Sequence, residues 1–114
     1  MNDEIEVILN DHIPLGDGNV PVAFMRYEGE SETYITYNSM GDLPGLSGDN
    51  TTLGSVIRYD IHIFSKTNYA NIEAAVKALL AAAGWTWKGS EPDLYEDDTG
   101  YYHKVNTFEK ERSY

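Results

Sequence analysis

A change of hydrophobic period between residues 55 and 83 constrains the fold of this chain more than any other feature of its sequence. From Ser55 to Ser65 apolar and polar residues alternate, which is typical of a β-strand with one buried and one solvated face. From Asn68 to Ala83 apolar residues recur at helical spacing, and Gly84 follows as a helix stop. Together these segments predict a helix packed on one face of a sheet. The expected core residues are Ile57, Tyr59, Ile61, Ile63, Ile72, Val76, Leu79, Leu80 and Ala83, whereas Arg58, Asp60 and His62 are expected on the solvated strand face.

Further segments rich in β-branched and aromatic residues have the composition of strands. The expected strands are Val20–Tyr27, Thr33–Asn38, Trp85–Lys88 and Tyr101–Lys110. The polar turn Glu28–Glu32 joins the first two, which are expected to be neighbours, and the acidic turn Ser90–Gly100 joins the last two.

The N-terminal segment Asn2–Asn10 predicts a short amphipathic helix, capped by Asn2 or Asp3 and closed by Pro14. Its apolar residues at the spacing of one helical face are Ile5, Ile8 and Leu9. The element order is then helix, three strands, helix, two strands, and the short connections favour antiparallel pairing. We therefore expect an α+β fold, with a mainly antiparallel sheet and one long helix and a short N-terminal helix packed on one face, in a single domain spanning residues 1–114.

The segment Ser39–Leu53 is expected to be a loop, because it has turn-forming residues throughout and too few apolar residues for a strand. Those residues are Gly41, Pro44, Gly45, Gly48, Asp49 and Asn50. Loops of about 15 residues without secondary structure are uncommon in compact domains and tend to be functional. We expect this loop to be an arm that becomes ordered on meeting a partner.

The charge of the chain argues against nucleic acid binding as its main function. Lys and Arg number 8 against 19 Asp and Glu, so the formal net charge is −11. Such a charge repels phosphate backbones and anionic membranes, and the cations are scattered along the chain. The absence of cysteine excludes disulfides and thiolate metal sites. The acidic N-terminus and the lack of an apolar run of about 18 residues favour a soluble protein made in the cytoplasm.

The densest polar cluster lies in the expected turn Ser90–Gly100. Its members are Glu91, Asp93, Glu96, Asp97 and Asp98, followed by His103. Converging carboxylates bind Ca²⁺ or Mg²⁺, and Asp97, Asp98 and the Thr99 carbonyl are the oxygens that such a turn offers. The spacing differs from that of the calcium loop of EF-hand proteins, so we expect a solvated bend at Asp97–Gly100, with neither metal nor cofactor.

Residues that carry catalysis in other proteins are present without the spacing that catalysis needs. Asp60 is an acid inside the expected strand Ser55–Ser65 with apolar neighbours, and alternation places it on the solvated face. The histidines lie on separate elements without metal-ligand spacing, and we expect surface residues or local hydrogen-bond partners: His12, His62 and His103. Ser39, Ser47 and Ser55 lack a nucleophile elbow, and the glycines of Gly41–Gly54 lack the lysine of a phosphate-binding loop. The sequence therefore predicts no enzyme.

Five large aromatic residues are the remaining feature: Trp85, Trp87, Tyr95, Tyr101 and Tyr102. Such residues anchor protein interfaces, and in strands they also pack in cores. Both roles stay open at this point.

Several segments, taken in order, resemble the tail completion (tail terminator) proteins of long-tailed bacteriophages. The likeness lies in Tyr34–Tyr37, in Tyr59–Ser65 with the alanine-rich helix that ends in Ala83-Gly84-Trp85, in Asp93–Lys104 and in Thr107–Glu109. It covers most of the chain from residue 20 onward. Because the likeness is in strand and turn patterns, it carries over no catalytic, cofactor-binding or metal-binding residue.

The resemblance implies a structural virion protein that caps the head-proximal end of the tail tube, terminates tail polymerisation and joins the tail to the head connector. It implies an α+β subunit in a ring of about six copies around the channel. The implied partners are other copies of the chain, the tail tube protein and the head–tail connector protein, without sequence-specific nucleic acid binding or a membrane. The implied location is the head-proximal end of the virion tail.

A ring requires two different contact patches on each subunit. We expect the Ser39–Leu53 loop and the aromatic and acidic region Glu91–His103 to supply them. The alternatives are another neck or tail assembly component, an acidic module that binds a basic protein, and a small metal-dependent enzyme built on the acidic turn.

Overall fold

The computed structural model describes residues 4–15, 18–44, 47–48, 51–52 and 54–113, and for residues 40–44, 47–48, 51–52, 54–55 and 111–113 it describes the backbone alone. In chain order the elements are α1 (Glu4–Leu9), β1 (Pro14–Leu15), β2 (Gly18–Asn19), β3 (Val22–Phe24), β4 (Thr33–Pro44), β5 (Ser47–Gly48), β6 (Thr51–Thr52), β7 (Gly54–Ser65), α2 (Ala70–Ala82), β8 (Thr86–Ser90), β9 (Leu94–Glu96) and β10 (Tyr101–Ser113).

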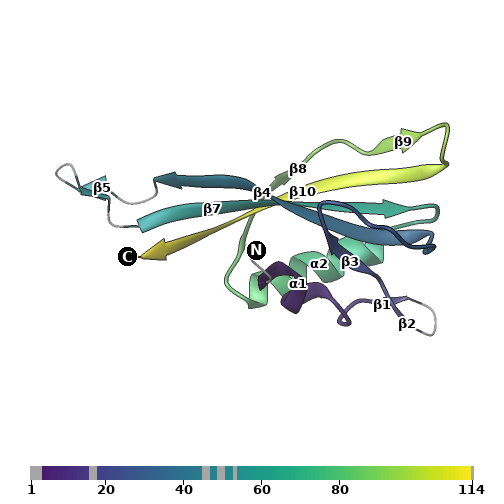
Figure 1. Cartoon of the computed structure of the whole chain (residues 1–114), viewed down its shortest axis with the longest axis horizontal. Coiled ribbons are helices and arrows are strands. Elements are labelled where there is room, and N and C mark those ends of the chain that lie inside the picture. Colours follow the sequence, from purple (N-terminus) through teal and green to yellow (C-terminus); the bar gives the residue numbers. More distant parts are fainter. Residues whose placement is uncertain (1–3, 16–17, 45–46, 49–50, 53, 114) are drawn as a thin grey trace.

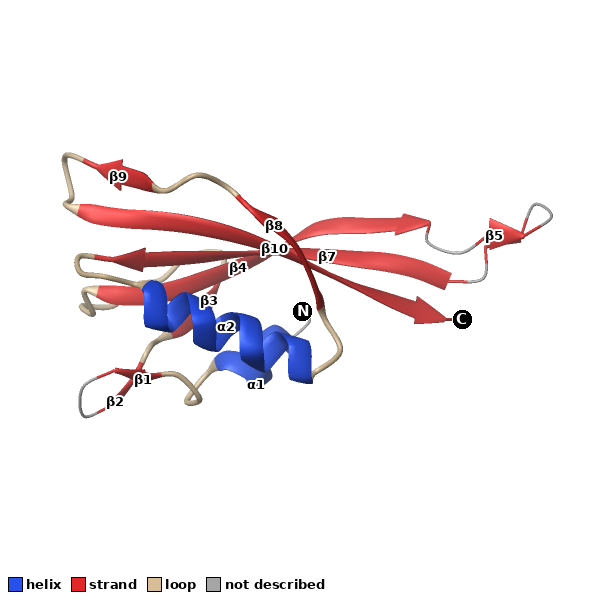
Figure 2. Ribbon diagram, turned by 180° about the vertical axis from the view of Figure 1, so that it is seen from behind, coloured by secondary structure: helices blue, strands red, loops and turns tan. Residues whose placement is uncertain are grey.

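A six-stranded sheet dominates the molecule, in the order β3-β4-β7-β10-β8, with β9 paired to β10 beyond this path. The pairings of β10 with β7, β8 and β9 and of β4 with β7 are antiparallel. Both helices lie against the same face of this sheet, and none of the described residues forms a helix on the opposite face (Figures 1 and 2). The expected α+β fold, with a mainly antiparallel sheet and helices on one side, is confirmed. Among the described helices, none is long and apolar enough to cross a membrane.

The core lies between the sheet and the two helices. Alternate residues of β7 point into it: Ile57, Tyr59, Ile61 and Ile63 are all buried. Ile72, Val76 and Leu80 of α2 are buried opposite them, while Leu79 and Ala83 pack at the edge of the cluster. In α1 the buried residues are Ile5 and Leu9, with Ile8 partly buried. The hydrophobic spacing of the sequence therefore identified the packed faces of β7, α2 and α1 correctly.

The ends of the helices have local causes. The Asn68 Oδ1 atom accepts a hydrogen bond of 2.8 Å from the Ala70 N–H at the start of α2. After α2, Gly84 has φ +94°, the left-handed conformation of a glycine helix stop, as expected. The expectation that Pro14 closes the first helix is wrong, because α1 ends at Leu9, Asp11 turns the chain with φ 64°, and Pro14 begins β1. The proposed caps Asn2 and Asp3 lie outside the described residues.

The strand β3 is the exception to antiparallel pairing, because it runs parallel to β4 with Val22 opposite Ile35. The connection over residues 25–32 therefore does not make a hairpin. The Tyr27 ring stacks on Tyr34 at 4.6 Å between centroids, and the Tyr27 hydroxyl accepts a hydrogen bond from the Ser31 N–H. These contacts hold the connection against β4 while the chain runs back to the start of that strand.

The expected loop Ser39–Leu53 is for the most part strand, and this prediction is wrong. The strand β4 continues to Pro44, with a bulge between Ser39 and Asp42, and β5 pairs with β6. On the other side of β7, β10 continues to Ser113. Because the pairing hydrogen bonds involve the backbone, the ladder extends through a segment whose side chains do not favour a strand.

Candidate functional site

The strands β4, β7 and β10 extend beyond the helices at one end of the molecule, to the left in Figure 1. We define this arm as residues 42–44 of β4, 54–56 of β7 and 111–113 of β10, together with β5 and β6. Among the described residues, β3 pairs with β4 at Ile35–Tyr37 and no strand pairs with the same side of β4 in the arm, so β4 is an edge strand there. An edge strand exposes backbone donors and acceptors that another chain can pair with.

The region Glu91–His103 lies at the opposite end of the sheet, where β9 pairs with β10 (Figure 1). The molecule measures 51 × 27 × 23 Å, and the arm and this region occupy the two ends of its long dimension. The connection between β9 and β10 is the expected bend at Asp97–Gly100. In this bend Gly100 has φ +76°, and the Thr99 hydroxyl donates a hydrogen bond to Glu96. The two patches expected from the sequence are therefore far apart, at opposite ends of the subunit.

Exposed apolar side chains gather on the β9–β10 pair. Leu94, Tyr95 and Tyr102 are 49%, 54% and 41% exposed, although they are large and apolar. The rings of Tyr95 and Tyr102 lie 4.9 Å apart, directly across the strand pair. By contrast, Trp85 is buried with its ring edge-on to Tyr59, so the five-residue aromatic set divides into core and surface members.

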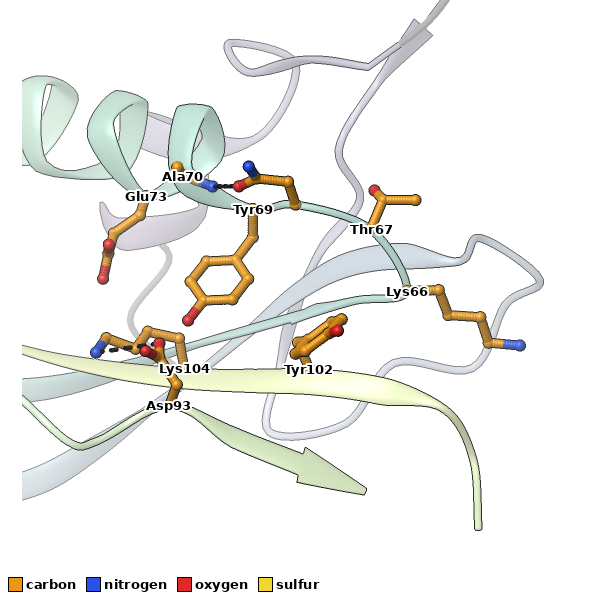
Figure 3. A pocket seen from close by; sticks show the side chains of 9 residues that line it. Lys66, Thr67, Tyr69, Ala70, Glu73, Asp93, Tyr102 and Lys104 are labelled. Carbon is orange, nitrogen blue, oxygen red and sulfur yellow. Dashed lines mark hydrogen bonds and ion pairs between the residues drawn. The ribbon is translucent and has the colours of Figure 1, made fainter. Parts of the chain in front are cut away.

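A groove of about 670 Å³ runs beside this surface, between the start of α2 and β10. Figure 3 shows Tyr69 at the start of α2 facing Tyr102 and Lys104 on β10, while Lys66 points away from them. The Lys104 Nζ atom lies 3.4 Å from a carboxylate oxygen of Asp93. The lining contains two lysines and two carboxylates, so it has no net charge that would select an anion or a cation.

The sheet face opposite the helices has a ladder of polar contacts between strands. Arg58 Nε donates to Glu109 at 2.6 Å, and the Thr107 hydroxyl donates to Asp60 at 2.8 Å. The Asp60 carboxylate is thus paired with a neutral hydroxyl on the half-buried side of β7. This arrangement stabilises the pairing of β7 with β10.

Two of the histidines, His62 and His103, contact each other on this face. The sequence did not predict this contact, because the two residues lie on separate strands. The His62 Nδ1 atom lies 3.0 Å from His103 Nε2, and His62 Nε2 lies 2.9 Å from Asn38 Oδ1. The His103 ring stacks on Phe64, with 4.2 Å between centroids. The sequence could indicate only that both histidines lie in expected strands. Their contact depends on the register between β7 and β10, which places positions 62 and 103 on the same face of the sheet.

Burial lowers the pKa of both imidazoles. For His62 the loss of solvation lowers the pKa, and the negative charge of Asp60 partly opposes this. For His103 burial again lowers the pKa most, the charge of His62 lowers it further, and Glu96 opposes both. The pair therefore favours a state in which at least one ring is neutral and the hydrogen bond between the rings can form.

Among the described residues, no three of His, Asp and Glu come together as metal ligands, and Asp93 instead pairs with Lys104. His12 is exposed and lies in the connection between α1 and β1. The side chains of Ser47 and Ser55 and of the glycine-rich segment Gly41–Gly54 lie outside the described side chains.

Comparisons with known proteins identify the fold. No protein-family model matches the chain, and no curated protein has a significantly similar sequence. Among solved structures, the chain is similar to a chain in a structure described as the virion of a native gene transfer agent particle. The TM-score is 0.56 at 13% sequence identity, and the match covers 99% of this chain and 87% of the other. The whole chain therefore shares the fold of a chain in that particle.

Proposed function

We propose that this protein is a structural component of a phage-like virion, and that it forms the ring that closes the head-proximal end of the tail tube. The observation that carries the proposal is the fold likeness to a chain of a gene transfer agent virion over 99% of this chain. The proposed role is to stop tail polymerisation and to join the tail to the head connector, without enzymatic activity.

The shape of the subunit supports a ring. Head-to-tail contacts join two different patches of successive subunits, and a ring closes when the rotations between successive subunits add up to one full turn. The arm and the β9–β10 pair, which carries the exposed side chains of Leu94, Tyr95 and Tyr102, lie at opposite ends of the molecule. We infer that the arm of one subunit contacts the β9–β10 end of the next subunit.

The charge of the chain supports a position beside passing DNA. A net charge of −11 repels phosphates, so a ring of these subunits lets DNA pass without binding it. This argument supports the proposed location and does not require any sequence-specific contact.

Sedimentation equilibrium over a wide range of protein concentration, with and without tail tubes, tests the proposal. We expect a closed oligomer of about six subunits, formed by the chain alone or on tube ends, and visible as a cap by electron microscopy. A chain that stays monomeric and does not bind tube ends would overturn the terminator role. Binding to a head connector alone would instead support a different neck component.

Two variants test the two patches. Deletion of Gly45–Asp49 is expected to leave a folded monomer that neither assembles nor terminates tails. The substitution Tyr95→Ser is expected to have the same effect, because it removes an exposed aromatic ring from the opposite patch. The matched control is Met25→Ser, which removes a 65% exposed apolar side chain outside both patches. Normal assembly by both patch variants contradicts the arrangement.

A further inference from the structure

We propose that His62 and His103 form a two-imidazole binding site for a divalent transition-metal ion, such as Zn²⁺, Ni²⁺ or Cu²⁺, on the sheet face opposite the helices. The two facing nitrogens, His62 Nδ1 and His103 Nε2, are 3.0 Å apart. Zn–N bonds are about 2.0–2.1 Å long, so two nitrogens bound to one tetrahedral ion lie about 3.3 Å apart. Ion binding therefore requires the two nitrogens to separate by about 0.3 Å and both rings to turn toward an ion that lies beside the line joining the nitrogens.

The hydrogen bonds around His62 leave the required nitrogen available. Asn38 Oδ1 accepts a hydrogen bond from His62 Nε2, so the proton of His62 is on Nε2 and the lone pair is on Nδ1. A metal-binding histidine usually donates the N–H of its other ring nitrogen to an oxygen acceptor, as His62 Nε2 does here. When the ion binds, the proton on His103 Nε2 moves to Nδ1 of the same ring, and no net proton transfer is needed.

The surroundings hold both rings in place before an ion arrives. His62 and His103 belong to β7 and β10, which pair over the whole length from Gly54 to Ser65. The Phe64 ring stacks on His103 with an interplanar angle of 17°. Ligands on paired strands lose little freedom on binding, which favours a preformed site.

The donor set selects the class of ion. Imidazole nitrogens suit Zn²⁺, Ni²⁺ and Cu²⁺, whereas Mg²⁺ and Ca²⁺ require several oxygen ligands. Within the described part of the chain no third His, Asp or Glu completes the group, so water molecules fill the other positions. This site is independent of the acidic turn Asp97–Gly100 and of the proposed ring.

Calorimetric titration of the untagged protein with NiCl₂, CuCl₂ and CoCl₂ tests the site. We expect one ion per chain, with Cu²⁺ bound more tightly than Ni²⁺ and Ni²⁺ more tightly than Co²⁺. The variant His103→Gln is expected to lose at least about tenfold in Ni²⁺ affinity, which corresponds to about 1.4 kcal/mol. The matched control His12→Gln is expected to bind Ni²⁺ as the wild type does, because His12 is exposed and outside the pair.

A measurement on the wild-type chain covers the case in which His103→Gln does not fold. Paramagnetic Cu²⁺ is expected to broaden the NMR signals of residues near His62 and His103 first. Broadening centred on His12 or on Asp97–Gly100, undiminished Ni²⁺ affinity in folded His103→Gln, or no Cu²⁺ binding at all would each overturn the proposal.

Discussion

His62 and His103 contact each other through ring nitrogens 3.0 Å apart, although 41 positions separate them in the chain. The antiparallel register places His62 opposite Val105 and His103 opposite Phe64, so the two imidazoles are diagonal neighbours on one face of the sheet. The contact requires that at least one ring is neutral, and it links the stability of the β7–β10 pair to pH.

We expect the metal-free protein to lose stability as the pH falls below about 6.5, the ordinary pKa of histidine. Burial lowers the pKa of both His62 and His103 in the folded state, so the unfolded chain binds more protons in the range between the ordinary and the lowered values. The contribution of the neutral pair to the free energy of unfolding is therefore present above about pH 6.5, and it is lost as the pH falls through the lowered pKa values.

Thermal unfolding in the presence of a chelator, from about pH 8 to about pH 5, measures this effect. The variant His103→Gln is expected to have a shallower pH dependence in this range than the wild type. The control His12→Gln has an exposed histidine replaced and is expected to follow the wild type. Equal slopes for wild type and His103→Gln would show that the pair does not contribute.

We expect Val76→Ala to destabilise the fold by about 2 kcal/mol, because it removes two methyl groups from a fully buried position. The matched control is Val7→Ala in α1, where the side chain is 69% exposed and the cost is expected to stay below about 0.5 kcal/mol. Urea unfolding of the two variants measures the difference. Similar losses for both variants would contradict the assignment of the core.

We expect Gly84→Ala to destabilise the fold by about 1–2 kcal/mol, because alanine is strained in the left-handed conformation at φ +94°. The strain is in the backbone, since the added methyl group would meet only the Lys110 side chain at 3.7 Å. The control Gly18→Ala adds a methyl group in open space, at a glycine without that conformation. A wild-type thermal midpoint for Gly84→Ala would refute the proposed role of this glycine.

We expect Asn106→Asp to destabilise the fold by about 2 kcal/mol or more. The buried Asn106 side chain donates to the Glu73 carboxylate at 2.9 Å and accepts from the Trp87 indole N–H at 2.9 Å. An aspartate keeps the acceptor, loses the donor and places a negative charge beside Glu73. Unfolding measured at neutral pH is the appropriate test, because acid would protonate the new carboxylate.

The matched control for this change is Asn68→Asp. Asn68 is exposed and accepts a hydrogen bond from the first N–H of α2, and an aspartate accepts that bond equally well at a helix N-terminus. We therefore expect its free energy of unfolding to equal or exceed that of the wild type. If Asn68→Asp and Asn106→Asp lower the free energy of unfolding equally, the hydrogen bonds of Asn106 to Glu73 and Trp87 do not explain the loss.

Local patterns in the sequence were sufficient to predict the packed layers. Alternation in Ser55–Ser65 identified the buried face of β7, and the spacing of Ile72, Val76 and Leu80 identified that of α2. Gly84 marked the end of that helix. These features depend on residues close together in the chain, because the period of side-chain direction is a property of each element by itself.

Features that depend on strand pairing were decided by the tertiary structure. The parallel pairing of β3, the extension of β4 to Pro44 and the contact between His62 and His103 all follow from which strands are neighbours and in which register. The ladder is formed by backbone hydrogen bonds, so a segment with turn-forming residues such as Gly41 becomes a strand once β7 lies beside it. The sequence by itself determined which faces are buried, and the pairing of distant strands determined the arm, the open face and the residues that meet there.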